Sequence, residues 1–184
     1  MTSHHPVEPI RSKRWVTLVA LLVPACAFLG LLAFATAKHG GAPAPGDRVP
    51  DFRAPLLSGH GSLSLSELRG RPVLLNFWWS QCGPCKQEAP MLRRAADVYR
   101  GKVTFVGIDV RDTKGAALRF VHRYNLDYRQ VRDEGLDIYR DYGLTGQPES
   151  FFIDQNGVLV QHIPGPLSRD VLYRLLDILV ARNA

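Results

Sequence analysis

Cys82 and Cys85 are the residues of this chain whose type and spacing suit them for chemistry, because they are the two cysteines of a Cys-Gly-Pro-Cys motif. The apolar segment Leu74–Trp79 precedes them and is strand-like. Gly83 and Pro84 predict the first turn of a helix, where the missing N–H group of proline leaves no hydrogen bond unmade. Cys82 is then expected at the helix N-terminus, where unpaired N–H groups and the positive end of the helix dipole stabilise a thiolate. A thiolate attacks disulfides, and a second cysteine one turn later resolves the mixed disulfide, so the motif predicts redox chemistry.

Metal and haem sites are the main alternative uses of two cysteines at this spacing. A zinc site needs two further ligands, but residues 39–184 contain no third cysteine and their histidines are scattered singly. A covalent haem site has a histidine directly after the second cysteine, where this chain has Lys86. A structural disulfide across so short a loop contributes little to stability. We therefore expect neither a metal nor a cofactor.

The segment Trp15–Ala37 contains no charged residue. At a rise of about 1.5 Å per residue, a helix of this length crosses a hydrocarbon core of about 30 Å. Arg11, Lys13 and Arg14 precede it, whereas only Lys38 follows closely. The positive-inside rule then predicts a single-pass protein of the bacterial inner membrane. Residues 1–14 would lie in the cytoplasm, residues 15–37 would form the transmembrane anchor, and everything after the anchor would lie in the periplasm.

Two alternatives remain open for this segment. The sequence Ala35-Thr36-Ala37 resembles a signal-peptide cleavage site, although the apolar run is longer than the usual core of about 7–15 residues. Cys26 is compatible with a lipoprotein, but the apolar sequence beyond it favours a thiol buried in lipid. In either case an exported domain keeps only Cys82 and Cys85, so its stability must come from a packed core rather than from structural disulfides.

The formal net charge of the chain is +6. Part of that excess lies in the basic residues that flank the apolar segment. The remaining surface is only mildly basic, which gives no argument for binding nucleic acid.

Residues 38–50 are rich in glycine, proline and alanine and predict a flexible linker, and residues 51–184 then have the size of one domain. Strand-like and helical patterns alternate along this domain. Asn156-Gly157 between two apolar runs indicates a hairpin, and Thr113 and Ser168 are candidate helix N-caps. Strands are expected over residues 51–57, 73–79, 103–110, 128–131, 150–153 and 158–163, and helices over 63–68, 84–100, 113–124, 136–142 and after 168. This order predicts an α/β fold with a mixed central sheet and helices on both faces.

From about Gly46 to its end, the chain resembles the thioredoxin superfamily, and within it the membrane-tethered CcmG/DsbE and ResA/TlpA-like proteins. The likeness rests on pieces in the family's order around the cysteine motif: Asp47–Phe52, Leu65–Val73, Asn76-Phe77-Trp78, Glu88-Ala89-Pro90 and Tyr142–Asp154. The Gly-Gln-Pro-Glu-Ser sequence in the last of these leans towards CcmG/DsbE. The resemblance implies a thioredoxin-like fold.

The resemblance also implies a thiol:disulfide oxidoreductase that acts as a reductant in cytochrome c maturation. Such a protein keeps the haem-binding cysteines of apocytochrome c as thiols, directly or through another maturation thiol protein. A transmembrane electron donor of the DsbD/CcdA kind would recharge it. The alternative is a TlpA-like reductant or a copper-site assembly factor for cytochrome oxidase, since a dithiol can hold Cu(I). The lack of a methionine or histidine cluster near the motif argues against direct copper delivery.

Four residues are the predicted site. Cys82 is expected to be the nucleophile with the more exposed sulfur, and Cys85 the resolving thiol; initiation by Cys85 is the alternative. Pro148 matches the family's cis-proline, which shapes the backbone beside the cysteines for a substrate strand; an ordinary loop proline is the alternative. Glu88 matches an acidic position of the tethered branch and, if buried, would tune thiol pKa values and transfer protons. A solvated surface glutamate is the alternative for that position.

Two positions depart from the family pattern. Asn76 stands where cytoplasmic thioredoxins usually have a buried aspartate. Because asparagine cannot titrate, proton transfer is expected to move to Glu88. Gln81 stands where an aromatic residue usually precedes the first cysteine, so the surface that faces a partner is expected to be more polar.

Overall fold

The computed structural model describes residues 11–37 and 42–183. The chain divides into two units, Met1–Gly40 and Gly41–Ala184. The predictions for residues 1–10 and for the first part of the linker, residues 38–41, lie outside the described residues.

The described part of the first unit is one helix, α1 (Arg11–Ala37), with Pro24 inside it. The helical conformation expected for residues 15–37 is therefore present. Among the residues that the structure describes, no helix is long and apolar enough to cross a membrane. The predicted transmembrane anchor is thus not confirmed.

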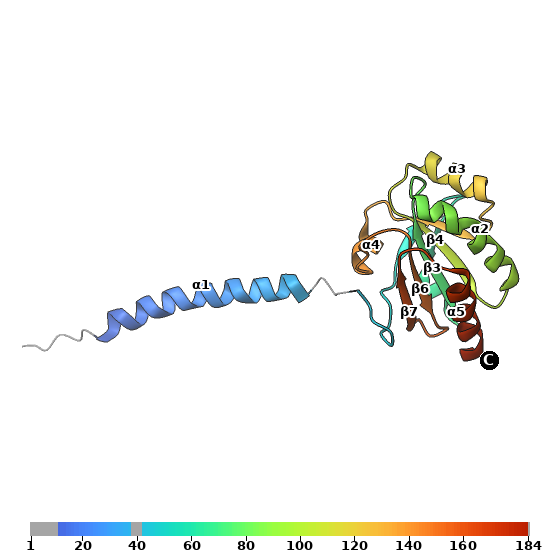
Figure 1. The fold of residues 1–184 in the computed structure, drawn as a ribbon. Coiled ribbons are helices and arrows are strands. Elements are labelled where there is room, and N and C mark those ends of the chain that lie inside the picture. The colour runs from blue at the N-terminus through green and yellow to red at the C-terminus, as the bar shows by residue number, and fades with distance from the viewer. Residues whose placement is uncertain (1–10, 38–41, 184) are drawn as a thin grey trace, which may run out of the picture. The chain divides into compact units, whose positions relative to one another are not determined.

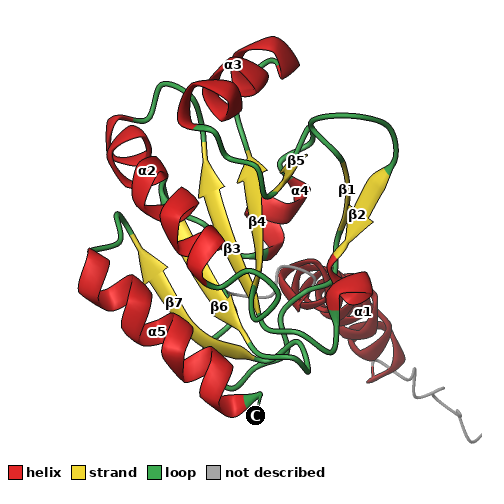
Figure 2. Ribbon diagram, turned by 90° about the vertical axis from the view of Figure 1, so that its right-hand side faces the viewer, coloured by secondary structure: helices red, strands yellow, loops and turns green. Residues whose placement is uncertain are grey.

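The second unit is built on a five-stranded mixed sheet. Its strands are β3 (Val73–Trp78), β4 (Thr104–Asp109), β5 (Arg129–Arg132), β6 (Glu149–Ile153) and β7 (Leu159–Pro164). They lie in the order β5-β4-β3-β6-β7 (Figures 1 and 2). The first three are parallel, and β6 runs antiparallel to both of its neighbours. The central strand β3 is buried along its whole length, as its continuous apolar sequence predicts.

Helices cover both faces of this sheet (Figure 2). They are α2 (Gly83–Val98), α3 (Lys114–Tyr124), α4 (Asp137–Asp141) and α5 (Arg169–Arg182). On one face, Leu74 of β3 packs in a cluster with Leu92 of α2 and Leu176 of α5. On the other face, Phe77 packs in a cluster with Ile138 of α4. The predicted mixed sheet with helices on both faces is confirmed.

The predicted helix N-caps and the predicted hairpin are present in the structure. The hydroxyls of Thr113 and Ser168 each accept a hydrogen bond from the backbone N–H group three residues later, so both residues cap their helices. In the hairpin between β6 and β7, a carboxylate oxygen of Asp154 accepts from the N–H groups of Asn156 and Val158. These bonds satisfy backbone groups that would otherwise be left without partners at the ends of elements.

The N-terminal extension of the domain differs from the prediction. Within residues 51–57 only Arg53–Pro55 (β1) is a strand, and it pairs with β2 (Ser62–Ser64) in a separate two-stranded sheet. The helical turn expected over 63–68 is shortened to a 3-10 helix, η1 (Leu65–Leu68). Pairing with β1 places Leu63 in the core, so tertiary contact overrides the local helical pattern there.

Phe151 of β6 lies at the centre of an aromatic cluster on the α4 face. Its ring centroid is 5.6 Å from that of Phe77 and 5.1 Å from that of Tyr142. The imidazole of His162 stacks on it at 4.1 Å. The hydroxyl of Tyr142 donates to the carbonyl oxygen of Pro50 at 2.8 Å, which ties the N-terminal extension to this cluster.

We predict that Phe151→Ala lowers the free energy of unfolding by about 3–5 kcal/mol, because it empties a fully buried ring site. Val98→Ala is the control, since Val98 is 61% exposed on α2 and its truncation should change stability by less than about 0.5 kcal/mol. Urea unfolding followed by circular dichroism measures both values. A loss for Phe151→Ala no larger than that of the control would contradict the assignment of the core.

Candidate active site

Cys82 and Cys85 form a disulfide at the start of α2, with their Cα atoms 5.2 Å apart. Cys82 is the N-cap residue, and the N–H group of Cys85 donates to its sulfur at 3.1 Å. Both cysteines are buried, with 5% of Cys82 and 2% of Cys85 exposed. The order of exposure agrees with the expectation, but the difference is small. Cys82 also lies at the positive end of the helix dipole, which favours a thiolate there.

The loop before β6 brings the predicted Pro148 to the disulfide. The Gln147–Pro148 peptide bond is cis, as predicted. The carbonyl oxygen of Gln147 lies 3.6 Å from the sulfur of Cys82, so in the dithiol state the Cys82 thiol can donate to it. This loop therefore presents main-chain groups directly beside the sulfur that a partner would attack or receive.

Glu149 holds this loop in place, a role that sequence reasoning missed. One of its carboxylate oxygens accepts from the N–H groups of Thr145 and Gly146, each at 2.8 Å. The other lies 2.7 Å from a ring nitrogen of His162. Glu149 is 1% exposed, and a buried carboxylate of this kind needs such partners to offset its desolvation. Its position directly after the cis-proline was the signal that could have found it.

Glu88 is buried, with 4% exposed, in agreement with the condition under which it was expected to act. It lies on α2 one turn after Cys85. Its carboxylate accepts from the side-chain amide of Asn76 at 2.8 Å and from the N–H group of Leu167 at 3.1 Å. Burial raises the pKa of Glu88 to about 7, and these two hydrogen bonds oppose that rise only in part. A carboxyl group with such a pKa exchanges protons readily near neutral pH.

Asn76 links Glu88 to the sheet. Its amide nitrogen donates to Glu88 on one side and to the hydroxyl of Ser150, its partner residue in β6, at 3.1 Å on the other. Asparagine thus acts as a fixed donor where thioredoxins usually carry a titrating group. Glu88 is the titrating group next to it.

A second missed residue, Asp112, fixes the loop between β3 and the disulfide. Its carboxylate accepts from the N–H group of Ser80 and, at 2.7 Å, from the hydroxyl of the same residue. Asp112 is itself oriented by Asp109, which accepts from its N–H group at 3.2 Å. Burial is the main cause that raises the pKa of Asp109, to about 6. Because β3 and β4 are parallel neighbours, the loops after them meet at one edge of the sheet, and this could have indicated the contact.

The aromatic residues before the motif divide between core and surface. Trp78 is buried and stacks on Phe120 of α3, with centroids 4.5 Å apart. Trp79 is partly exposed, and the guanidinium of Arg111 lies 5.8 Å from its ring centroid. Gln81 is exposed directly before Cys82, so the rim of the disulfide is polar as expected.

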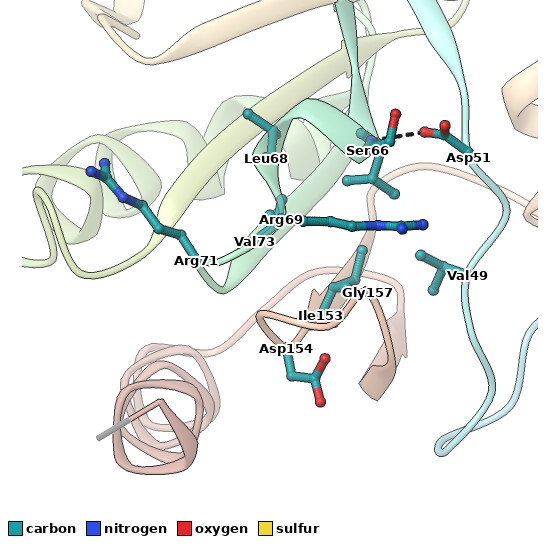
Figure 3. Close-up of a pocket in the computed structure, with 11 residues that line it drawn as sticks. Val49, Asp51, Ser66, Leu68, Arg69, Arg71, Val73, Ile153, Asp154 and Gly157 are labelled. Atoms are coloured by element: carbon teal, nitrogen blue, oxygen red, sulfur yellow. Dashed lines mark hydrogen bonds between the residues drawn. The ribbon is translucent and has the colours of Figure 1, made fainter.

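A small pocket lies away from the disulfide, at the opposite end of β3 (Figure 3). Val73, Leu68 and Ile153 contribute its apolar wall, and the Arg69 side chain extends along it. Its volume of about 20 Å³ has room for little more than one water molecule. No predicted site residue lines it. Among residues 11–37 and 42–183, no group of three or more histidine, cysteine, aspartate or glutamate side chains is placed to hold a metal ion.

The fold and the site together define a thiol–disulfide oxidoreductase of the thioredoxin-like fold. The profile of the AhpC/TSA family matches residues 45–162. The chain belongs to this family.

Named relatives agree with that chemistry. The chain is 33% identical over 132 residues to the thiol-disulfide oxidoreductase ResA of Bacillus thuringiensis subsp. konkukian, covering 71% of this chain and 76% of the relative. It is 32% identical over 165 residues to the thiol:disulfide interchange protein DsbE of Pseudomonas fluorescens biotype C, covering 88% and 90%. Among solved structures, it is similar to a secreted Mycobacterium tuberculosis disulfide oxidoreductase homologous to E. coli DsbE. That match has a TM-score of 0.65 and 33% identity, and covers 70% of this chain and 96% of that one.

We predict that the stability of wild type relative to Glu88→Gln falls as pH rises. The pKa of Glu88 is raised in the folded state from 4.5 to about 7, so between these values the folded protein binds more protons than the unfolded chain. The glutamine variant lacks this proton, and its advantage should grow by about 3 kcal/mol between pH 4.5 and pH 8.

Urea unfolding of the oxidised protein at both pH values measures this difference. Glu134→Gln is the control, because it makes the same substitution at an exposed glutamate, whose carboxylate pairs with Arg132. A gap between wild type and Glu88→Gln that is the same at both pH values would contradict the raised pKa.

Proposed function

We propose that this protein is a membrane-anchored periplasmic reductant that acts in cytochrome c maturation. It would reduce the haem-binding cysteines of apocytochrome c, directly or through another maturation thiol protein, and be recharged by a DsbD/CcdA-like transmembrane donor. The observation that carries the proposal is the Cys82–Cys85 disulfide at a helix N-terminus beside a buried glutamate whose pKa is about 7. The names of the ResA and DsbE relatives support the thiol–disulfide chemistry.

The proposed reaction moves two electrons and two protons to the partner. The Cys82 thiol gives its proton to solvent, and the thiolate attacks one sulfur of the partner's disulfide, so that a mixed disulfide forms and the second partner sulfur leaves and takes a proton from solvent. The Cys85 thiol then loses its proton, which the Glu88 carboxylate accepts, and attacks the sulfur of Cys82. The Cys82–Cys85 disulfide forms, and the first partner sulfur leaves as a thiol with the proton that Glu88 gives up.

The dipeptide between the cysteines indicates the direction of electron transfer. Gly-Pro is the thioredoxin type, and thioredoxin has a potential of about −270 mV, against about −120 mV for the strong oxidant DsbA. A potential near the thioredoxin value makes the dithiol form a reductant. Equilibration with glutathione measures the reduction potential of the Cys82–Cys85 pair. A reduction potential above about −150 mV would contradict this direction of electron transfer.

Removal of each cysteine in turn tests the order of attack. We predict that reduced Cys85→Ser accumulates a mixed disulfide with an oxidised Cys-x-x-Cys-His peptide, because Cys82 attacks and nothing resolves the product. Cys82→Ser should accumulate little or none. Non-reducing mass spectrometry measures both adducts, and the reverse pattern would make Cys85 the nucleophile.

The biological role is tested in cells. Loss of the gene should lower the content of c-type cytochromes, and an added small thiol should restore it, because the missing step is a reduction. Normal cytochrome content in the deletion strain would contradict a role in this maturation.

Anchoring is proposed on the uncharged segment Trp15–Ala37 and the basic residues before it. The alignment with the Pseudomonas fluorescens DsbE covers 88% of this chain and so extends into that segment. We predict that alkaline phosphatase fused after the C-terminus is active and stays in the membrane after carbonate extraction. Release of an active fusion into the periplasmic fraction would favour cleavage after Ala37, and an inactive fusion would contradict the orientation.

A further inference from the structure

A groove of about 330 Å³ lies between the start of α2 and helix α3. We call it the basic groove. Its lining includes Ser80, Lys86, Arg119, Phe120, Arg123 and Tyr124. Phe120 supplies a buried aromatic surface and Tyr124 a partly buried one, and their rings contact each other with centroids 4.8 Å apart. The lining thus combines two aromatic rings with three charged side chains.

The charge of the groove is one-sided. Lys86, Arg119 and Arg123 are exposed, and no carboxylate lines the groove. None of the ion pairs found among the described residues involves these three side chains. Helix α3 contains no acidic residue at all.

Some other arginines on or next to the helices of the same domain do form ion pairs. Arg93 and Arg100 both pair with Asp97 on or next to α2, and Arg140 pairs with Asp137 on α4. Arg94 of α2 and Arg174 and Arg182 of α5 have no ion pair among the described residues either, so what distinguishes the groove is that three such cations line one hollow beside the disulfide. Such a cluster attracts an external anion most strongly when the surrounding wall is apolar.

The position of the groove ties it to the redox centre. Ser80 precedes Cys82 by two residues and Lys86 follows Cys85 directly. Phe120 belongs to the same buried cluster as both cysteines. A polypeptide joined to the sulfur of Cys82 would therefore lie beside the cis-proline loop, which contacts that sulfur. It would also lie close to the basic groove, because Ser80, two residues before Cys82 in the sequence, lines that groove.

We infer that the basic groove docks an acidic segment of the protein whose disulfide is exchanged at Cys82. This inference rests on the proposed exchange function and specifies its partner. The bound group is a polypeptide, because it must carry the cysteine that reacts with Cys82. It is acidic, because the three cations of the groove form no ion pair within the described part of the chain. Charge complementarity of this kind raises association rates and sets partner choice.

The test compares two charge-reversed variants of the full chain. Lys86→Glu/Arg119→Glu/Arg123→Glu reverses the groove. Lys102→Glu/Arg174→Glu/Arg182→Glu is the matched control, because it makes the same change in net charge at exposed residues outside the groove. Each reduced protein is mixed with two disulfide peptides of equal length, one flanked by four aspartates and the other by four lysines. The measured quantity is the ratio of the two second-order reduction rates, in which any common change in sulfur reactivity cancels.

We expect wild type and the control to reduce the acidic peptide about tenfold faster than the basic one at low salt. The groove variant should lose or invert this preference, and salt at about 0.5 M should flatten it in wild type. A wild-type ratio near one, or an equal loss of preference in the control, would overturn the inference.

Two further measurements separate this inference from the proposed function. Failure to reduce both peptides and the neutral bis(2-hydroxyethyl) disulfide would contradict exchange itself. Docking without exchange is measured by the fluorescence anisotropy of a labelled aspartate peptide that contains no cysteine. Its affinity should fall about fivefold or more in the groove variant and stay within about twofold in the control; equal affinities in all three proteins would overturn the docking inference.

Discussion

The burial of one face of α2 against β3 is the constraint on which the site depends. That face carries Cys85 and, one turn later, Glu88, so the same packing that fixes the helix removes both side chains from water. A carboxyl group in that place needs donors, and Asn76 of β3 and the N–H group of Leu167 before α5 supply them. Their number is insufficient to keep the pKa of Glu88 at its ordinary value. The proton chemistry near the sulfurs is therefore a consequence of core packing.

The edge of the sheet where β3 ends gathers the remaining parts of the site. The loops that follow β3 and β4 are joined there by the bonds from Ser80 to Asp112. The loop before β6 reaches the same edge, since β6 is antiparallel to β3, and Glu149 fixes it in front of Cys82. The buried carboxylates of Asp112 and Glu149 thus position the backbone around the disulfide through hydrogen bonds. The sulfurs themselves stay free to exchange partners.

Local signals predicted much of the fold. The apolar run of β3, the caps at Thr113 and Ser168 and the hairpin at Asn156-Gly157 each depend on a few adjacent residues, and each acts as expected. The strand β2 was missed because Ser62–Ser64 is extended only through its pairing with β1, seven or more residues away in sequence. Asp112 was missed for the same reason, since its partner Ser80 belongs to another loop, and so was the contact of Glu149 with His162 of β7.

The sequence by itself determined the redox pair, the Cys-Gly-Pro-Cys motif and the order of the elements that form the main sheet and its helices, because these depend on residue type and short-range spacing. It also placed Pro148 and Glu88 among the candidates through a family resemblance. Only the tertiary structure decided that Glu88 is buried, that the carbonyl of Gln147 lies against Cys82, and that the cations beside the motif have no anionic partner among the described residues. These properties depend on which distant segments meet, and in a close-packed interior that is settled only when the whole chain folds.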